Sequence, residues 1–580
     1  MSIPTPDLGR RRFLAGLLLI IACAGLLRGI FPAADPPWQA TVGIVWHDEG
    51  AWTHNARNKA LFGEWSLDAW NPMYIAPVFT ALETASFHLF GVGVRQARIV
   101  PAVLGVLSVA LLALGVRRIA GGHAGLAAGA LLATNFVYVM WNRTAMMEGP
   151  MVAFIVIAWY CYVRAQTEAW WGWLAGICAL LAFFTKAAAV FFVGAMGLDA
   201  AVVAVLALRT RSQSSPLDRA RSRAAWATLG GLAAGSVVAL AAFVGPNWSE
   251  YRFYNFDMSV TRKPSYDLRS LVNRVSWFPI VHDIFTRMWA VLVVGVAAGL
   301  GMLARWRDLH AGERLLLLWV GLGSLELILH DTGNERRFVF LIPAFIALAA
   351  SALGRGRALL PPQAAEVPLR HALLAAPLIG FAFYMVAGAI VRLAFLYEVQ
   401  PNVRLAAALA VGATAGLLAT WPRIPAWLAA ARWSPAAGLA LALLIAAGHL
   451  GEYIQWATGR TYKNYEASLQ VGARLPAGTL VHGKLANGLA LENHIKPVFV
   501  GRGFGNYADR RDRDDVRYIL TYLAPRIGYE GSVITDVLDA YPHHTIVMTF
   551  DVAETTSGHD RAALIDKFGA APPREGRAQH

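Results

Sequence analysis

The sequence predicts an α-helical membrane protein that crosses the bilayer many times and ends in a small extracytoplasmic α/β domain. Composition is the first reason: of 580 residues, 57% are hydrophobic and 15% are charged, whereas soluble domains carry about 25% charged residues. The mean hydropathy of +0.46 agrees. Apolar runs of about 20 residues, the length that crosses a bilayer, recur through residues 1–455 but not through residues 456–580. This pattern excludes an ordinary cytosolic enzyme, a disordered chain and a disulfide scaffold.

The charge distribution indicates membrane topology. The formal net charge is +14, yet residues 456–580 hold 15 Lys and Arg against 14 Asp and Glu. Nearly all of the basic excess therefore lies in the apolar region, where it marks cytoplasmic loops, and no nucleic-acid partner is expected. Cys23, Cys161 and Cys178 are the three cysteines and all lie in apolar runs, so neither a disulfide framework nor a zinc site is predicted.

The first predicted span is residues 13–31. The cluster Arg10-Arg11-Arg12 precedes it and resembles an export signal. Cleavage of such a signal would release a soluble protein, whereas many further apolar runs follow here. We therefore expect an uncleaved helix in the inner (plasma) membrane, with the N-terminus in the cytoplasm.

Thirteen spans are predicted in all. They are residues 13–31, 98–116, 124–141, 149–165, 170–185, 187–208, 225–245, 284–304, 315–330, 337–354, 371–395, 403–421 and 435–455. Residues 73–90 are long enough to cross but contain Pro77, Glu83 and His88. If they crossed, the loop 209–223 with its five arginines would lie outside. The positive-inside rule therefore predicts an interfacial helix at 73–90 and an extracytoplasmic C-terminus.

Three segments are expected on the outer side in this topology: residues 32–97, residues 246–283, and the region from residue 456. Residues 1–455 form the predicted transmembrane domain, residues 456–570 the α/β domain, and residues 571–580 a flexible tail. Within the α/β domain, strands are predicted at 479–482, 497–500, 516–521 and 544–550, with a helical stretch at 484–492.

Four outward turns carry charged residues, which are costly at membrane depth and therefore informative. The turns follow the first span, begin the fourth, separate the fifth from the sixth, and precede the tenth. Their titratable residues are Asp48 and Glu49, Arg143 and Glu148, Lys186, and Arg336 and Arg337. Because arginine counts alone fix the topology, the agreement of the four turns on one side supports a common site.

The chain resembles the lipid-linked sugar transferases with the GT-C fold in four places. These are the Asp48-Glu49 pair, the segment from Phe90-Gly-Val-Gly-Val-Arg95 to Pro101, Glu148, and Thr185-Lys186. Within that class it is most similar to the aminoarabinose transferases and the protein O-mannosyltransferases (glycosyltransferase family 39 type). The resemblance covers about residues 13–345. It implies a GT-C fold, a polyprenyl-phosphate sugar donor, and catalysis at the extracytoplasmic face.

Site residues follow from this resemblance position by position. Asp48 takes the place of the family's catalytic carboxylate, and Glu148 that of a second functional acid. Lys186 matches the family's turn lysine, and Arg336-Arg337 falls where the family has a basic turn.

Two departures limit what the resemblance implies about the substrate. Ala51 stands where aminoarabinose transferases have Arg, and Asn71-Pro72 where they have Lys-Pro. The aminoarabinose substrate is therefore not implied. The sugar stays open, as does the acceptor, which in this class is a glycan, a lipid or a protein.

The chemistry agrees with these residue types. Sugar transfer from a lipid phosphate to a hydroxyl group needs a carboxylate that takes the hydroxyl proton. It also needs positive charge where the departing phosphate becomes more negative. The expected catalytic residues are Asp48, Glu49 and Glu148, and the expected phosphate-binding residues are Lys186, Arg336, Arg337 and Arg143. A single displacement would invert the anomeric configuration.

Structural readings of the same residues stay open. Asp48 could cap the following helix and Glu148 its own helix. Lys186 could be an interfacial anchor, and Arg336-Arg337 could hold lipid headgroups. A divalent metal could bind near His47, His54, Asp48 and Glu49, although no ligand spacing is diagnostic; no other cofactor is expected.

Two other functions are compatible with a polytopic chain. One is a membrane transporter or lipid-sugar flippase without transferase activity. The lack of a detectable internal repeat and the placement of the acidic residues outside the spans count against it. The other is a non-catalytic scaffold whose C-terminal domain binds a partner.

Overall fold

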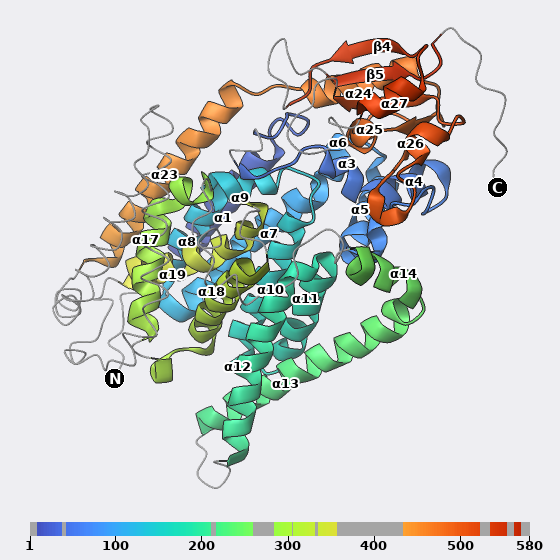
Figure 1. Cartoon of the computed structure of the whole chain (residues 1–580). Coiled ribbons are helices and arrows are strands. Elements are labelled where there is room, and N and C mark those ends of the chain that lie inside the picture. The colour runs from blue at the N-terminus through green and yellow to red at the C-terminus, as the bar shows by residue number, and fades with distance from the viewer. Residues whose placement is uncertain are drawn as a thin grey trace, which may run out of the picture.

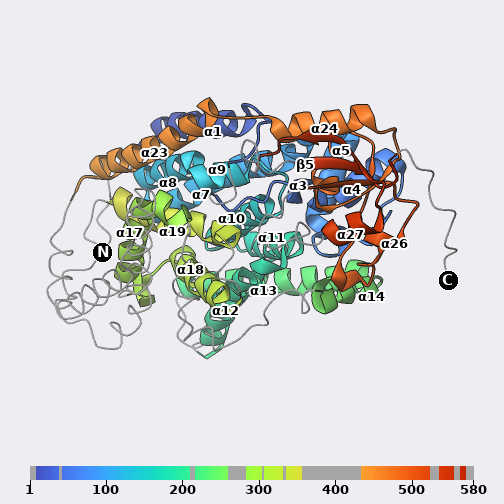
Figure 2. The same cartoon turned by 45° about the horizontal axis from the view of Figure 1, so that its top comes forward.

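The computed structural model describes residues 8–37, 42–209, 216–258, 283–303, 306–330, 335–355, 433–522, 534–553 and 562–569. Long helices form one bundle, and a small sheet with its own short helices lies at one end of that bundle (Figure 1). The second view shows the same division, with the sheet next to helices α3, α4 and α5 of the first loop (Figure 2). Those helices comprise Asp48–Trp52, His54–Phe62 and Pro77–Phe90.

Eleven of the thirteen predicted spans coincide with helical segments in the described part of the chain. The helices are α1 (Arg10–Gly29), α7 (Ile99–Ala120), α8 (Gly122–Thr134), α9 (Phe136–Trp141), α10 (Glu148–Ala165), α11 (Trp171–Thr185), α12 (Val190–Arg209), α13 (Pro216–Ala239), α17 (Asp283–Leu303), α18 (Ala311–His330), α19 (Ile342–Arg355) and α23 (Pro435–Thr458). The spans predicted at 371–395 and 403–421 lie outside the described residues. Among the described residues, six helices are long and apolar enough to cross a membrane by length and composition. The count of thirteen stays a prediction.

The third predicted span, 124–141, is two helices. Asn135 separates α8 from α9, and its side-chain oxygen accepts a hydrogen bond from the backbone N–H of Tyr138. An asparagine that caps a new helix ends the preceding one, which the apolar character of the run does not reveal. Both helices are buried in the centre of the bundle.

Glycines bring the central helices close together. A Cβ atom at Gly354 of α19 would lie 2.3 Å from the backbone of Ala124 in α8, and one at Gly438 of α23 would lie 1.9 Å from the carbonyl oxygen of Leu353. Small residues at such crossings let helix backbones approach closely, which favours packing in the absence of a hydrophobic driving force between helices.

The segment 73–90 contains the short helix α5 (Pro77–Phe90), which has 14 residues. A spanning helix needs about 20 residues, so α5 is too short to cross. It begins after the turn Pro72–Tyr74 and packs against α4 and α11. This length agrees with its exclusion from the predicted spans.

The C-terminal region contains a five-stranded mixed sheet with the order β2-β1-β3-β5-β4. The strands are β1 (Leu480–His482), β2 (Lys496–Val498), β3 (Tyr518–Tyr522), β4 (Thr545–Phe550) and β5 (Ala562–Asp566). β1 runs parallel to β2 and β3, whereas β5 is antiparallel to β3 and β4. Helices α24 (Lys463–Arg474), α25 (Lys484–Gly488) and α27 (Ile534–Ala540) accompany the sheet.

All four predicted strands are present, but β5 was not predicted. It is fully buried between β3 and β4. Its sequence Ala-Ala-Leu-Ile-Asp has no alternation of apolar and polar residues and contains two alanines, which are poor strand formers. The core under this sheet also contains Trp46, from the first loop, so the two predicted domains share a hydrophobic cluster.

Candidate active site

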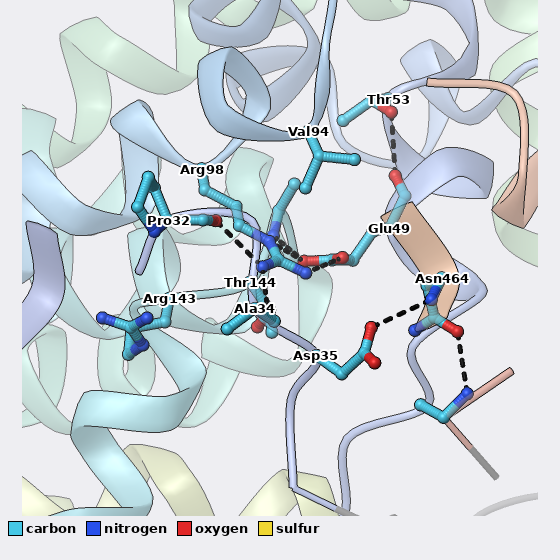
Figure 3. A network of polar contacts seen from close by, with 12 residues as sticks. Pro32, Ala34, Asp35, Glu49, Thr53, Val94, Arg98, Arg143, Thr144 and Asn464 are labelled. Atoms are coloured by element: carbon cyan, nitrogen blue, oxygen red, sulfur yellow. Dashed lines mark hydrogen bonds and ion pairs between the residues drawn. The ribbon is translucent and has the colours of Figure 1, made fainter. Parts of the chain in front are cut away.

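Glu49 lies in a buried ion pair at the start of the first loop. Arg98 donates from Nε to Oε1 at 2.9 Å and from Nη2 to Oε2 at 2.6 Å, so the pair is bidentate (Figure 3). The backbone N–H of Ala145 donates to the same Oε1 at 2.7 Å. Only 7% of each charged side chain is exposed. Glu49 therefore connects the first loop, the start of α7 and the turn before α10.

Asp48 has a different environment, although it is the next residue. It begins α3, and 23% of its side chain is exposed. Its Oδ1 lies 3.8 Å from Nε2 of His47. Of the two neighbouring carboxylates, Asp48 is thus the one that a substrate can reach.

Glu148 and Lys186 form a second ion pair. Glu148 is the first residue of α10, and Lys186 is the extended residue that ends α11. Lys186 Nζ donates to Glu148 Oε1, with 13% and 1% of the two side chains exposed. An acid at a helix N-terminus and a cation at a helix C-terminus are each favoured by the helix dipole.

These contacts bring three of the four predicted turns together. Glu49 and Ala145 join the first turn to the second, and Glu148 and Lys186 join the second to the third. The fourth turn leads into the 3-10 helix η8 (Glu335–Leu341). In η8, the ring centroid of Phe340 lies 4.4 Å from that of Phe191, which follows Lys186 by five residues. Arg336 and Arg337 belong to η8, but their side chains lie outside the described residues.

Arg143 points away from this group. Its Nη1 donates to the carbonyl oxygens of Leu27 and Arg28, and its Nη2 to that of Phe31. Figure 3 shows the guanidinium to one side of the Arg98–Glu49 pair. Burial lowers the pKa of Arg143 to about 10, so the group is still charged at neutral pH. The structure therefore separates Arg143 from Lys186, with which the sequence analysis grouped it.

Glu83 of α5 adds a third buried carboxyl group near Glu49. Burial, with a smaller contribution from Glu49, raises its pKa well above the usual value. Neither oxygen has a hydrogen-bond partner among the residues that the structure describes. Burial of this kind favours the neutral form of a carboxyl group over the charged one.

The C-terminal region covers the loop that carries Asp48. Arg57 of α4 is fully buried and donates to the carbonyl oxygens of Ala490, Asn493 and Ile495 at 2.8 to 3.0 Å. Burial lowers its pKa to about 9. A Cβ atom at Gly50 would lie 1.9 Å from the carbonyl oxygen of Asn487. α25 thus packs directly on α3, next to the two carboxylates.

Further contacts hold the same interface. Asp35 accepts hydrogen bonds from the N–H groups of Lys463 and Asn464 at the start of α24. Asp68 accepts one from the N–H of Phe499, and its other oxygen lies 2.9 Å from Nε2 of His54. His54 is thereby engaged away from Asp48.

Sequence reasoning missed these connecting residues. Arg98 lies within the motif that carries the family resemblance, so its position gave a signal, but no role was assigned to it. No signal in the sequence indicated Arg57 or Gly50, because their partners lie more than 400 residues away in the chain.

Among the residues that the structure describes, no three His, Cys, Asp or Glu side chains lie close enough together to hold a metal ion. His47 and Asp48 are adjacent, whereas Glu49 is bound to Arg98 and His54 faces Asp68.

Comparison with known proteins supports the reading of the fold. Residues 74–217 match the family model described as dolichyl-phosphate-mannose-protein mannosyltransferase. ArnT from Cupriavidus metallidurans in the apo state superimposes with a TM-score of 0.52 and 16% identity, over 97% of this chain and 98% of that chain. No curated protein matches by sequence.

Two further solved structures give lower TM-scores. ArnT from the same organism bound to undecaprenyl phosphate gives a TM-score of 0.49, with 16% identity over 97% of this chain and 98% of that chain. The oligosaccharyltransferase AglB of Archaeoglobus fulgidus, in complex with an inhibitory peptide and a dolichol-phosphate, gives 0.40, with 12% identity over 88% and 69%.

The structural similarity defines the fold. The chain is a multi-pass membrane protein with the GT-C fold, and residues 74–217 match a family model named for a mannosyltransferase.

Proposed function

We propose that the protein transfers a sugar from a polyprenyl-phosphate donor to a hydroxyl group of a glycan, lipid or protein acceptor, with inversion at the anomeric carbon. The observation that carries this proposal is the partly exposed Asp48, which directly precedes Glu49, the residue that binds both Arg98 and the turn leading to the Glu148–Lys186 pair. The matched family model, which is named for a dolichyl-phosphate donor, supports the donor class.

Asp48 is the proposed general base. Its carboxylate takes the proton of the acceptor hydroxyl while the hydroxyl oxygen attacks the anomeric carbon. The bond between that carbon and the phosphate oxygen breaks, and the phosphate leaves with additional negative charge. Lys186, Arg336 and Arg337 are the proposed cations that stabilise this charge.

The remaining predicted residues are proposed to hold the site in position. Glu49 fixes Arg98 and the N–H of Ala145, so it supports the turn on which Asp48 lies. Glu148 holds the ammonium group of Lys186. Arg143 fixes the end of α1 through three carbonyl oxygens, which supports a positioning role in place of donor binding.

A divalent metal is proposed only at His47 and Asp48, where two suitable ligands are adjacent. The steps above do not pass through it. Turnover measured with and without a chelator tests whether the enzyme needs such an ion.

The site is proposed to face the extracytoplasmic side of the inner (plasma) membrane, with the N-terminus in the cytoplasm. The support is the positive-inside rule, applied to the Arg10-Arg11-Arg12 cluster and to the arginines of 209–223.

The test is a turnover screen of the detergent-purified chain against several labelled polyprenyl-phosphate sugars, with a mixed envelope extract as acceptor source. We expect transfer with one donor class and loss of roughly 10²–10⁴-fold in Asp48→Asn, the value of a general base. Glu64→Gln is the matched control, because Glu64 is an exposed carboxylate of the same loop.

Two outcomes would contradict the proposal. One is a folded Asp48→Asn variant that keeps more than about a tenth of wild-type turnover. The other is movement of the lipid-linked sugar across a vesicle membrane with no transfer to any acceptor, which is the behaviour of a flippase.

A further inference from the structure

A cavity of about 490 Å³ lies at the end of α1 and the start of α7, and its lining is strongly basic. Four arginines contribute to it, and no carboxylate does. Its lining residues are Arg28, Gly29, Pro32, Phe90, Arg95, Gln96, Arg98, Ile99, Ala102 and Arg143.

Two of these arginines are buried with only neutral partners. Arg28 is 3% exposed and donates to Asn142 Oδ1 and to the carbonyl oxygens of Ala24 and Ala133. Its Nη2 is buried and has no hydrogen-bond partner among the described residues. Arg143 is 4% exposed and donates to three carbonyl oxygens at the end of α1.

The carboxylates near the cavity already have partners. Glu49 is bound to Arg98, and Asp35 accepts from the start of α24. Glu492 accepts from the N–H of Val94. Glu83 is fully buried in α5, and burial raises its pKa, which favours its neutral form. Arg28 and Arg143 therefore have carbonyl and amide dipoles and aromatic rings as partners, the nearest ring centroids being those of Tyr138 at 5.6 Å from Arg28 and Trp456 at 4.6 Å from Arg143. Neither has a carboxylate partner among the described residues, although buried charges normally require an opposite charge.

We propose that this cavity binds the phosphate group of an anionic membrane lipid. A guanidinium presents parallel N–H groups that match phosphate oxygens, and the buried, unpartnered Nη2 of Arg28 is the donor that such a group would satisfy. Arg95 lines the same cavity and is exposed, so it can reach the headgroup from the water side.

The apolar part of the surroundings favours a lipid over a free phosphate ion. Phe90, Ile99 and Ala102 line the cavity beside the arginines. Leu26 of α1 and Val103 of α7 continue from it with exposed fractions of 59% and 60%. A phosphate bound by the arginines would therefore leave its acyl chains on apolar surface of two spanning helices.

This site is separate from the proposed donor phosphate site at Lys186, because Arg143 is directed toward α1 and Lys186 toward Glu148. The proposal does not depend on sugar transfer, since it concerns binding alone.

The test is lipid binding to the full chain in zwitterionic detergent, measured by native mass spectrometry and by titration with fluorescent phosphatidylglycerol. We expect phosphatidylglycerol to bind and phosphatidylcholine to bind much more weakly. Arg28→Gln and Arg95→Gln should each weaken phosphatidylglycerol binding by about tenfold or more, the value of a charge-assisted hydrogen bond. Arg118→Gln is the matched control, because Arg118 is an exposed arginine at the opposite end of α7.

Four results would overturn the proposal. The first is unchanged binding in both cavity variants. Because Arg95 is at the surface, Arg95→Gln should fold, and it tests the proposal even if Arg28→Gln fails to fold. The second is equal binding of phosphatidylcholine. The third is displacement of the lipid by millimolar inorganic phosphate, which would mean a free anion. The fourth is competitive displacement by polyprenyl phosphate, which would mean that the cavity is the donor site.

Discussion

Asp48 and Glu49 are adjacent acids with opposite environments. Neighbouring residues of a helix point about 100° apart, so one can reach solvent while the other is buried. The sequence predicts an acidic pair here, and the family resemblance selects Asp48. It does not reveal that Glu49 is bound to Arg98 and Ala145, because these partners lie 49 and 96 residues away. Local sequence patterns do not predict long-range contacts of this kind.

Glu49→Gln should destabilise the protein. The substitution leaves Arg98 buried at 7% side-chain exposure without a counter-charge, and breaking such a pair costs about 3–5 kcal/mol. Thermal unfolding in detergent measures the loss, and Asp48→Asn is the control that should melt near the wild type. A Glu49→Gln protein of normal stability but without turnover would instead make Glu49 a catalytic residue.

Lys186→Met should weaken donor binding and should also lower the stability of the protein. The lysine ends α11 and pairs with Glu148, whose side chain is 1% exposed, so its removal leaves a buried carboxylate without a counter-charge. Loss of one charge-assisted contact to the phosphate corresponds to about tenfold or more in donor affinity. Glu148→Gln should give a smaller loss, because it removes only the partner of the lysine. Equal donor affinity in Lys186→Met and wild type would make the lysine an interfacial anchor.

His482 should make the C-terminal sheet sensitive to acid. Burial, assisted by Lys567 and Arg513, lowers its pKa to about 3, and neither ring nitrogen has a hydrogen-bond partner within the described residues. Between its unfolded pKa of about 6.5 and a folded pKa near 3, the unfolded chain binds the additional proton. Stability is therefore full above about pH 6.5 and falls by up to about 1.4 kcal/mol per pH unit below it.

Hydrogen exchange of peptides from β1 and β3, compared at pH 5 and pH 7 after correction for intrinsic rates, measures this loss. In His482→Leu, the difference in exchange protection between pH 7 and pH 5 should be smaller than in the wild type. If the leucine variant shows the same acid sensitivity as the wild type, another group is responsible.

At the scale of elements, apolar runs predict where helices lie, and turn residues decide where they end. Residues 124–141 read as one span, yet Asn135 divides it into α8 and α9. The strand β5 was missed because it is short and rich in alanine. Its strand conformation comes from pairing with β3 and β4. β3 ends 40 residues before β5 begins, and β4 ends 12 residues before it. Local pattern carries no information about that pairing.

Gly50→Ala should disturb the contact between α3 and α25. The added Cβ would meet the carbonyl oxygen of Asn487 at 1.9 Å, and because both sides are backbone, one element must move. Such overpacking typically costs 1–3 kcal/mol. We expect faster hydrogen exchange in α25 and reduced turnover. Gly25→Ala is the control, since nothing lies within 4 Å of the added atom in α1. Wild-type exchange and turnover in Gly50→Ala would show that the two elements can separate without effect.

At the scale of the whole molecule, the sequence predicted a membrane bundle with a C-terminal α/β region, and the structure agrees (Figure 1). It did not predict that the two regions share a core. Trp46 packs beneath the sheet, and Arg57 and Asp35 bind residues of the C-terminal region. The boundary at residue 455 is therefore a change in composition and not a separation between independent units.

A reporter fusion tests the proposed orientation. A periplasmic reporter such as alkaline phosphatase, fused to the intact chain at its C-terminus, should be active, because the thirteen-span topology leaves that end outside. A cytoplasm-specific reporter at the same site should be silent. The opposite result would place the sheet, and with it the proposed site, on the cytoplasmic side.

The three hydrogen bonds of Arg57 also have a consequence for biosynthesis. The arginine and its first acceptor, the carbonyl oxygen of Ala490, are 433 residues apart. At ribosomal rates of about 5–20 residues per second, roughly 20 to 90 seconds pass between the two. During that interval the loop bearing Asp48 has left the ribosome without its final partners. The loop therefore reaches its final packing only when the last quarter of the chain arrives, and a nascent protein released early lacks the contacts that hold the proposed active site.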